Sequence, residues 1–502
     1  MPKLGTVISL IDSPNTNKFA FVINDDEINK VRVGQFVELN LSEGKLIAVV
    51  TSISRSNRYF ERAESVAEYE KNSSIYDNFP INDWSYTIAE TKILGVYNNF
   101  LQRCSYPPAP GTDILSVDEE LLTKYLGFRS NGLNIGKLMN HDVNVRLGLS
   151  KLFQKHVAIL AMSGAGKSYL MSVLLEELAD RKKEDGRIGI VIFDVHGEYT
   201  QLKRSPLADK VQIFNGDKIK LSTKNTINEI SKFIKDGAQK RMFSSLFYDL
   251  VKQYRNERKH FSLKDIIQLL SQEENDKSKL KTAGLLIDTL NQLHKTKLFG
   301  KGDDPSVETL VQPGKISVIN LRDVDDEMSK QLIVSYYTRK LFNSIKKGKI
   351  CPYLLVVEEA HNFAAEKVKR NDMLARYEIE KIAREGRKFG ASLCLISQRP
   401  VRLSTTALSQ CNTHIILRVT NPYDIKHIGE SSEGIDNYML NSVTSLKTGE
   451  ALIVGEAVVQ PIFVKVRKRK YEYISNETDL ESLAKLYEND KEKKYDDVGA
   501  FF

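Results

Sequence analysis

The clearest chemical signal in the sequence is a short glycine-containing loop. Residues 161–168 read AMSGAGKS and stand between the apolar run HVAILAM and the amphipathic segment YLMSVLLEELADR. A strand, a curled loop and a helix in this order form a phosphate-binding loop, because backbone N–H groups and the positive end of the helix dipole face the anion. We expect Lys167 to contact the β- and γ-phosphates of ATP and Ser168 to give Mg²⁺ a hydroxyl ligand.

The rest of this loop is predicted to contact the nucleotide through the neighbours of those two residues: Ser163, Gly164, Ala165, Gly166 and Tyr169. The pattern G-x-x-x-x-G-K-[ST] fails only at its first position, where Ala161 replaces glycine. A glycine-containing turn with an incidental lysine is the alternative, and the flanking strand and helix disfavour it.

Two adjacent acids end the apolar run YLLVVEE, at Glu358 and Glu359. A buried strand rarely ends in paired carboxylates unless they hold a cation or a water molecule. In nucleotide hydrolysis the first acid helps to hold Mg²⁺, usually through water, and the second polarises the attacking water. We assign Glu358 and Glu359 to these roles in that order, although aspartate is commoner at the first position. A solvated strand end is the alternative.

Two further apolar runs also end in polar residues. FDVHGEY places Asp194, His196 and Glu198 beyond the carboxyl end of a strand, where α/β sheets bind ligands. We predict that Asp194 helps to bind the nucleotide and that His196 shapes the site by hydrogen bonding rather than by ligating metal. LISQRP places Gln398 where it could sense the γ-phosphate or orient the water, and a purely structural glutamine is the alternative.

These motifs stand at the ends of nearly continuous apolar runs separated by segments with helical periodicity. Such runs are typical of strands buried on both faces of a parallel sheet, so we predict an α/β doubly wound core. The runs lie at 156–162, 188–195, 315–321, 353–359, 392–398 and 414–420.

The remaining segments define the predicted domain organisation. Short β-branched runs at intervals of about ten residues predict a small β-barrel over residues 1–110. Apolar residues spaced at i, i+3, i+4 and i+7 predict a helical bundle over residues 221–311. We predict a connecting linker over 111–144, the α/β core over 145–220 and 312–460, and a hairpin end with a charged tail over 461–502.

Composition excludes several classes of protein. The 502 residues are 41% hydrophobic and 27% charged, which rules out a fully disordered or collagen-like chain. The sequence shows neither an apolar run long enough to cross a bilayer nor a secretory signal, so we expect a cytoplasmic protein without membrane segments. The net charge of +8 permits a polyanionic partner without demonstrating one. Four cysteines without a CxxC pair predict reduced thiols rather than zinc ligands or disulfides.

Taken together, HVAILAMSGAGKS, FDVHGEY, LLVVEEAHNF, IAREGRKFG and LISQRP resemble, in this order, the motifs of the HerA family of hexameric ATPases, relatives of the FtsK-type DNA translocases. The resemblance covers roughly residues 145–460, and the β-rich N-terminus resembles the small barrel of that family. It implies a RecA-like P-loop core with an N-terminal small β-barrel and here an inserted helical bundle. It also implies a homo-hexameric ring that binds ATP between subunits and encloses double-stranded DNA.

The resemblance assigns further basic residues. Arg384 in IAREGRKFG matches an arginine that contacts nucleotide in the family, and Arg387 is a second candidate nearby; a solvated helix face is the alternative. Lys155 and His156 stand where the family often has Arg-His, whose arginine reaches the neighbouring site. Lys155 is therefore a candidate intersubunit contact, although lysine lacks the bidentate fork of arginine.

A translocase must grip the phosphate backbone of DNA with lysine and arginine on loops. KVKR follows the acidic strand, which makes Lys367, Lys369 and Arg370 candidate DNA contacts, and a solvated charge run is an equal alternative. KVRKRK at 465–470 is more basic but belongs to the terminal hairpin, where it could contact a partner or the exterior of a ring.

Three functions fit the resemblance. The leading one is an ATP-hydrolysing DNA translocase or helicase that works with a NurA-type partner nuclease in DNA processing. The alternative is a scaffold and regulator in an antiviral defence complex, docked to an effector such as a SIR2-type NADase or a nuclease. A conjugative coupling ATPase is the third, and the absence of an apolar run long enough to span a membrane counts against it.

Overall fold

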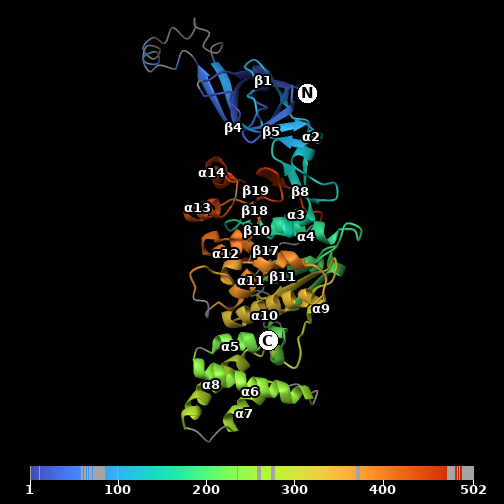
Figure 1. Cartoon of the computed structure of the whole chain (residues 1–502), viewed down its shortest axis with the longest axis vertical. Coiled ribbons are helices and arrows are strands. Elements are labelled where there is room, and N and C mark those ends of the chain that lie inside the picture. The colour runs from blue at the N-terminus through green and yellow to red at the C-terminus, as the bar shows by residue number, and fades with distance from the viewer. Residues whose placement is uncertain are drawn as a thin grey trace, which may run out of the picture.

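The computed structural model is elongated, with three parts arranged along its long axis: an N-terminal barrel, an α/β core and a helical bundle (Figure 1). It describes residues 2–471 except 11, 58–59, 61–63, 65, 67–70, 72–84, 99, 235, 257–261, 273–276, 369–372 and 433, together with 481–482, 484–485 and 487–488.

The N-terminal part is a closed six-stranded barrel. Its strands are β1 (Lys3–Ile8), β2 (Lys18–Ile23), β3 (Phe36–Leu41), β4 (Gly44–Asn57), β5 (Ser85–Asn98) and β7 (Asp113–Ser116), and β6 (Phe100–Gln102) pairs with β5. The strand order is β2-β1-β7-β3-β4-β5, and the pairing of β2 with β5 closes the barrel. Phe19, Phe21 and Val37 are buried inside it, because alternate side chains of a strand face one side.

One mixed sheet forms the core. In spatial order its strands are β12 (Val211–Asn215), β15 (Ile316–Asn320), β11 (Gly189–Asp194), β16 (Tyr353–Val357), β17 (Ala391–Ser397), β10 (Val157–Leu160), β18 (Thr413–Ile416), β19 (Glu450–Gly455), β20 (Ile462–Val466), β8 (Leu133–Leu138) and β9 (Asn144–Leu147). The strands from β12 to β18 are parallel, and the remaining strands pair antiparallel.

Helices cover both faces of the parallel strands. In β10, Ala158 and Leu160 pack in one hydrophobic cluster with α10 (Glu327–Lys346) and α11 (Leu374–Glu385), whereas Val157 and Ile159 pack in another with α4 (Lys167–Ala179). Burial of both faces explains why the sequence of these strands is almost continuously apolar. The shorter helices are α2 (Glu119–Tyr125), α3 (Leu149–Phe153), α9 (Val307–Leu310), α12 (Thr405–Ser409), α13 (Pro422–Ser431) and α14 (Asn437–Ser445).

The helical bundle is inserted between β12 and β15. It consists of α5 (Ile227–Phe233), α6 (Gly237–Asn256), α7 (Leu263–Gln272) and α8 (Lys277–Lys295). Two short parallel strands, β13 (Leu221–Ser222) and β14 (Phe299–Gly300), pair where the chain enters and leaves the insertion. Arg339 on α10 donates from Nε to Glu229 on α5 over 2.7 Å, and the Glu229 side chain is fully buried, so this ion pair fastens the bundle to the core.

The segment 111–144 differs from the prediction, because it is not a linker. It contributes β7 to the barrel and β8 to the core sheet, where β8 pairs with β20. The hairpin end at 461–466 likewise belongs to the core sheet. These strands have only four to six residues, and their partners are distant in the sequence, so a local pattern of residues does not reveal them.

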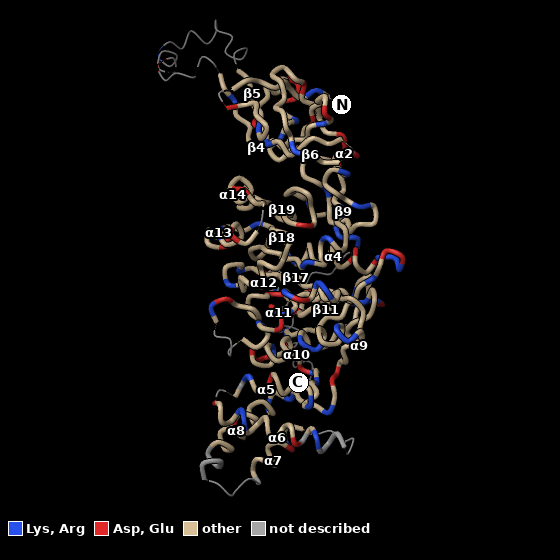
Figure 2. Tube along the Cα trace, in the orientation of Figure 1, with Lys and Arg blue, Asp and Glu red and all other residues tan. Residues whose placement is uncertain are grey.

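Charged residues of both signs are distributed over the barrel, the core and the bundle (Figure 2). Among the described residues, no helix has the length and apolar character needed to cross a membrane. Of the four cysteines, Cys104, Cys394 and Cys411 are buried, Cys351 is half-buried, and all are reduced.

Candidate functional site

The phosphate loop connects β10 to α4, as the sequence predicts. Gly164 and Gly166 have φ angles of 74° and 99°, and Gly166 is the N-terminal cap of α4. Residues with a Cβ atom rarely adopt these angles, so glycine is required for the curl of the loop. Ala161 is not among the residues with positive φ, and its N–H donates to the Ser397 carbonyl over 3.2 Å. Alanine therefore costs the loop no backbone strain at this position.

An open pocket of about 670 Å³ lies above the loop. This volume is within the roughly 300–1,000 Å³ that is usual for small-molecule sites. We call it the nucleotide pocket, and its lining residues are Ser163, Gly164, Gly166, Lys167, Ser168, Tyr169, Ser172, His196, Gly197, Glu198, Gln201, Leu202, Arg322, Gln398, Thr448 and Arg469. Six of the seven residues predicted in the loop line it, and the seventh, Ala165, is buried beneath.

Glu359 lies beside the phosphate loop with its carboxylate held by neighbours. Gln398 donates from Nε2 to Glu359 Oε1 over 2.5 Å, and Lys167 Nζ lies 3.9 Å from the same oxygen. The backbone of Glu359 is left-handed, with φ 45° and ψ 46°. Such an angle is unusual for a residue with a side chain and is often found at functional sites. The strand end thus brings together three residues that the sequence predicts for one site.

His361 is a further neighbour that we did not predict. Its Nδ1 atom lies 3.2 Å from Glu359 Oε2 and 3.1 Å from the Ser397 hydroxyl. Burial lowers the pKa of His361, and Arg399 and Arg402 lower it further, whereas Glu359 raises it. In EEAHNF one residue, Ala360, separates the histidine from the paired acids, so its position in the motif was the available signal.

Glu358 is directed away from the nucleotide pocket. It is 2% exposed, and its Oε2 atom accepts the Val195 N–H over 3.0 Å. Burial and the neighbouring Asp194 and Glu198 raise the pKa of Glu358, which is hydrogen-bonded to Asp194. The carboxyl group of Glu358 is thus hydrogen-bonded within the protein, and its assignment to a metal ion stays a prediction.

Asp194 is not among the residues that line the nucleotide pocket, and it shapes the site from behind. It is fully buried, and its carboxylate accepts the N–H groups of Gly197, Glu198 and Tyr199 over 2.8, 3.0 and 2.9 Å. Burial raises the pKa of Asp194, and the hydrogen bonds oppose that shift. The three hydrogen bonds fold the loop after β11 so that Glu198 reaches Ser168, whose hydroxyl donates to it.

The oxygen atoms of Ser168 and Glu198 are suited to hold a magnesium ion. A hydroxyl and the Glu198 carboxylate face the open pocket, and Mg²⁺ usually binds through one or two protein oxygens together with substrate phosphates. Among the described residues, no preformed group of three or more His, Cys, Asp or Glu is arranged to hold a metal on its own. Glu198 is thus the carboxylate nearest the predicted hydroxyl ligand.

Lys167 is surrounded by acids. Burial lowers the pKa of Lys167, and the charges of Glu359, Glu198 and Glu358 raise it. A cation held over the phosphate loop and flanked by carboxylates matches the needs of a bound polyphosphate and its metal ion.

The two arginines predicted to contact nucleotide, Arg384 and Arg387, and the candidate intersubunit residue Lys155 are absent from the described lining of this chain's own pocket. Arg384 on α11 lies 3.8 Å from Glu380, and its side chain is 44% exposed. Arg387 is exposed, and Lys155 forms an ion pair with Glu456 over 2.5 Å. Each remains accessible to a neighbouring molecule.

His156, next to Lys155, connects two elements of the core. Its Nδ1 atom accepts the Leu393 N–H over 3.0 Å, so its Nε2 carries the proton and donates to the Ala383 carbonyl, also over 3.0 Å. The ring is thereby neutral, and burial lowers its pKa to about 4. These two hydrogen bonds hold the C-terminal end of α11, next to Arg384, against the start of β17.

Of the three candidate DNA contacts, the structure describes only Lys367, which is exposed on the loop after β16. Lys369 and Arg370 lie outside the described residues. The loop is tied to the next one along the sheet edge, since Ala365 forms a bridge with Leu403. In the basic run at 465–470, which was considered as a contact for a partner or for the exterior of a ring, residues 467–470 lie against α4.

Several pocket residues were not predicted from the sequence, among them Arg322, Thr448 and Arg469. Arg469 belongs to the basic run that we had considered as a DNA or partner contact. Arg322 follows β15, and Thr448 precedes β19, and neither carries a local signal, because only the strand order brings them to the phosphate loop.

Comparison with known families and proteins gives consistent results. Residues 133–341 match the family model described as the central domain of helicase HerA, and residues 7–99 match the HAS barrel domain. A probable helicase of Methanocaldococcus jannaschii is 31% identical over 93% of this chain and 95% of its own length. The DNA double-strand break repair helicase HerA of Sulfurisphaera tokodaii is 31% identical over 88% of this chain and 89% of its own.

Solved structures resemble the fold at much lower sequence identity. VirB4 of Thermoanaerobacter pseudethanolicus superposes with a TM-score of 0.53 at 18% identity, covering 68% of this chain and 98% of its own. The bacterial conjugative coupling protein TrwB gives a TM-score of 0.50 at 13% identity, covering 71% and 93%. These likenesses place the core among P-loop folds and say nothing further about activity.

Proposed function

Because the chain belongs to the HerA helicase family and is an ATPase, we propose that it is a motor that couples ATP hydrolysis to movement along double-stranded DNA. The observation that carries this proposal is the placement of Glu359 between Gln398 and Lys167 at the phosphate loop. A carboxylate in this position can activate water next to a bound γ-phosphate.

The residues of the pocket divide the chemistry among them. Lys167 and the loop N–H groups balance the charge of the polyphosphate, and Glu359 accepts a proton at its carboxylate from the attacking water. Gln398 orients the Glu359 carboxylate. Mg²⁺, when bound, supplies further neutralisation of the phosphate charge, and Ser168 and Glu198 would hold it.

We propose further that the active form is a ring of six identical subunits. Arg384, Arg387 and Lys155 are accessible and lie outside the described lining of their own pocket, which supports a site completed by a neighbour. A pocket lined by one subunit and completed by the next fits a heterologous interface, which forms a ring when its rotation closes.

Lys367, with Lys369 and Arg370, is proposed to contact the DNA backbone. Lys367 is exposed on the segment that follows Glu359 by eight residues, so one loop connects the hydrolytic carboxylate to the candidate DNA contact. Contacts to phosphates hold DNA without reading its sequence, as a translocating motor requires.

A nuclease of the NurA type is the proposed partner in DNA processing. The alternative is a scaffold and regulator of an antiviral complex, docked to an effector subunit. The bundle supports a docking role in either case, because Tyr248 on α6 is 68% exposed and Leu285 on α8 is 51% exposed. Purification of the native complex followed by identification of its second subunit separates the two.

The central test measures ATP hydrolysis and translocation by the full chain. We expect linear double-stranded DNA to stimulate hydrolysis, and the protein to displace the third strand from a triplex placed along that DNA. Lys167→Ala abolishes both activities, because the phosphates lose their main cation. Lys182→Ala is the matched control, since Lys182 is exposed beyond the end of α4 and outside the described pocket.

The outcomes separate the parts of the proposal. A rate of ATP hydrolysis that DNA does not change, together with an intact triplex, would refute the proposed motor function and favour the role as a regulator. If wild-type protein does not hydrolyse ATP in any of these conditions, the assignment of Glu359 fails as well.

A further inference from the structure

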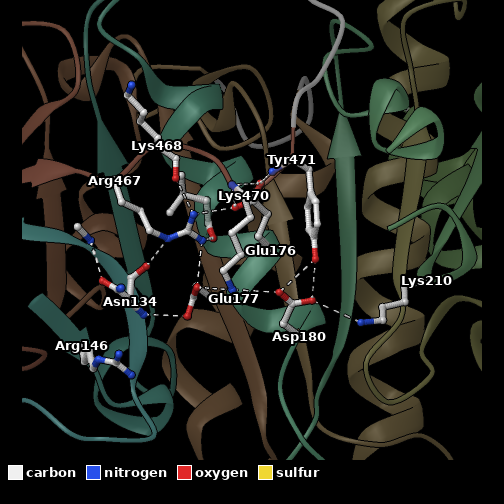
Figure 3. Close-up of polar contacts among 12 residues, drawn as sticks. Asn134, Arg146, Glu176, Glu177, Asp180, Lys210, Arg467, Lys468, Lys470 and Tyr471 are labelled. Atoms are coloured by element: carbon white, nitrogen blue, oxygen red, sulfur yellow. Dashed lines mark hydrogen bonds and ion pairs between the residues drawn. The ribbon is translucent and has the colours of Figure 1, made fainter. Parts of the chain in front are cut away.

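The chain crosses the phosphate-loop helix after its last strand. Residues 467–471, which we call the strap, follow β20 and lie along α4, where they contact three acids near the C-terminal end of that helix (Figure 3). These acids are Glu176, Glu177 and Asp180. The strap thus contacts the same helix whose first residues, Lys167 and Ser168, are proposed to hold the phosphates and the metal ion.

Glu176 is the main anchor of the strap. Its side chain is fully buried, and Arg467 Nη1 lies 2.9 Å from Oε2. The same carboxylate accepts the Lys470 N–H over 3.0 and 3.1 Å and the Tyr471 N–H over 3.3 Å. Arg467 also donates to the Asn134 carbonyl over 2.9 Å and to Glu177 over 3.0 Å. A buried carboxylate with this many donors fixes the path of the backbone.

Arg469 stands between these anchors and faces the nucleotide pocket. Its guanidinium carbon lies 4.4 Å from the centre of the Tyr169 ring, and its backbone N–H donates to the Tyr169 hydroxyl over 3.0 Å. Both residues line the nucleotide pocket. The strap and the phosphate-loop helix therefore build one stacked pair in the wall of that pocket.

The sheet order shows which part of a nucleotide this wall faces. Asp194 ends β11, and Glu358 and Gln398 follow β16 and β17; these three strands lie on one side of the phosphate-loop strand β10. Thr448 and Arg469 flank β19 and β20, on the other side. A nucleotide whose phosphate end lies at Lys167 and Glu359 has room to extend its nucleoside towards Tyr169, Thr448 and Arg469.

We propose that Tyr169 and Arg469 form the wall against which the nucleoside of the bound nucleotide packs, so that the C-terminal strap completes the nucleotide site. This inference rests on the proposed ATPase function and deepens it, because it names the residues that recognise the part of the ligand beyond the phosphates. An arginine already stacked on a tyrosine presents a flat cationic face that suits a purine base.

The anchoring of the strap has a physical purpose in this arrangement. A guanidinium on a loose segment would lose conformational freedom on binding the base, which weakens binding. Here the contacts of Arg467 and Lys470 with α4 hold Arg469 on either side, so the stacking face exists before the nucleotide arrives.

The test compares two ligands that share their phosphates and differ in the nucleoside. Binding of ADP and of pyrophosphate, each with Mg²⁺, is measured by calorimetry on the full chain as wild type, as Arg469→Ala and as Lys468→Ala. Lys468 is the matched control, because it carries the same charge on the same strap, and its side chain is exposed. We expect Arg469→Ala to weaken ADP about tenfold, the size of one stacking contact, and to leave pyrophosphate within about twofold.

Each of the other possible results contradicts either this inference or the proposed ATPase site. Equal loss for both ligands would mean that Arg469 acts on the phosphates, and unchanged ADP binding would mean that it does not touch the ligand; both overturn the inference. A loss of the same size in Lys468→Ala would also overturn it, because general charge would then be the cause. If wild-type protein binds neither ligand, the proposed ATPase site fails, and that result is distinct from the others.

Discussion

The two adjacent glutamates at the end of β16 give the sharpest test of the site. Sequence reasoning assigned Glu358 to the metal and Glu359 to the water, whereas in the structure only Glu359 reaches the phosphate loop, and Glu358 is hydrogen-bonded to Asp194 and to the Val195 N–H. We therefore expect Glu358→Gln and Glu359→Gln to behave very differently, although both replace a carboxyl group by an amide at neighbouring positions.

The expected sizes follow from these contacts. Removing a general base costs about 10²–10⁴ in rate, or roughly 3–5 kcal/mol of barrier, so Glu359→Gln should be nearly inactive. A glutamine at 358 retains an oxygen for the Val195 N–H and an amide that can donate to Asp194. The exchange of one hydrogen bond for another is worth about 1 kcal/mol, which corresponds to less than about tenfold in rate.

The assay is steady-state ATP hydrolysis with saturating DNA over a range of Mg²⁺ concentrations. Loss of a carboxylate that orients the metal would lower metal affinity by about 10–100-fold. If Glu358→Gln requires that much more Mg²⁺, or is as inactive as Glu359→Gln, the structural assignment of Glu358 is wrong. ADP binding by each variant shows that the pocket is intact.

Three further predictions concern other parts of the core. If Arg384 acts across an interface, mixing Arg384→Ala with Lys167→Ala subunits restores part of the hydrolysis that each lacks alone, and no recovery contradicts this role. Burial lowers the pKa of His156 to about 4, so its contribution to the free energy of unfolding is complete above about pH 6.5 and is lost as the pH falls towards 4, by roughly 3 kcal/mol. Thermal unfolding measured between pH 7 and 4 should therefore show a flatter decline of stability in His156→Gln than in the wild type. An identical decline in both proteins would exclude the effect. Lys367→Ala should reduce the slope of log affinity for DNA against log salt by roughly 0.9 for each phosphate contact removed, and an unchanged slope would place Lys367 away from DNA.

The sequence was most informative where local pattern and chemistry coincide. The parallel strands were predicted because each is apolar on both faces, and the phosphate loop because Gly164 and Gly166 are required for its curl. The predicted α/β core, the small barrel and the HerA resemblance are all confirmed. The short strands β7, β8 and β9 were missed, because distant partners, and not their own sequence, make them strands.

Roles within the site were harder to predict than its location. Glu358 and Asp194 follow apolar strands just as Glu359 does, and nothing in the sequence states which carboxylate faces the pocket and which faces its neighbour. That distinction depends on the left-handed backbone at Glu359 and on the N–H groups of the loop after β11. Arg469 was missed for a related reason, since a run of basic residues does not reveal the aromatic ring on which one of them stacks.

The paired strands β13 and β14 have a consequence for how this molecule can vary. Since residues 221–222 and 299–300 lie side by side, the inserted helices leave the core and return to it at one place. The spacing between β12 and β15 in the sheet is set by their own pairing and is independent of how many residues the inserted helical bundle contains. Its length and surface can therefore diverge while the edge that carries the phosphate loop and Glu359 keeps its geometry.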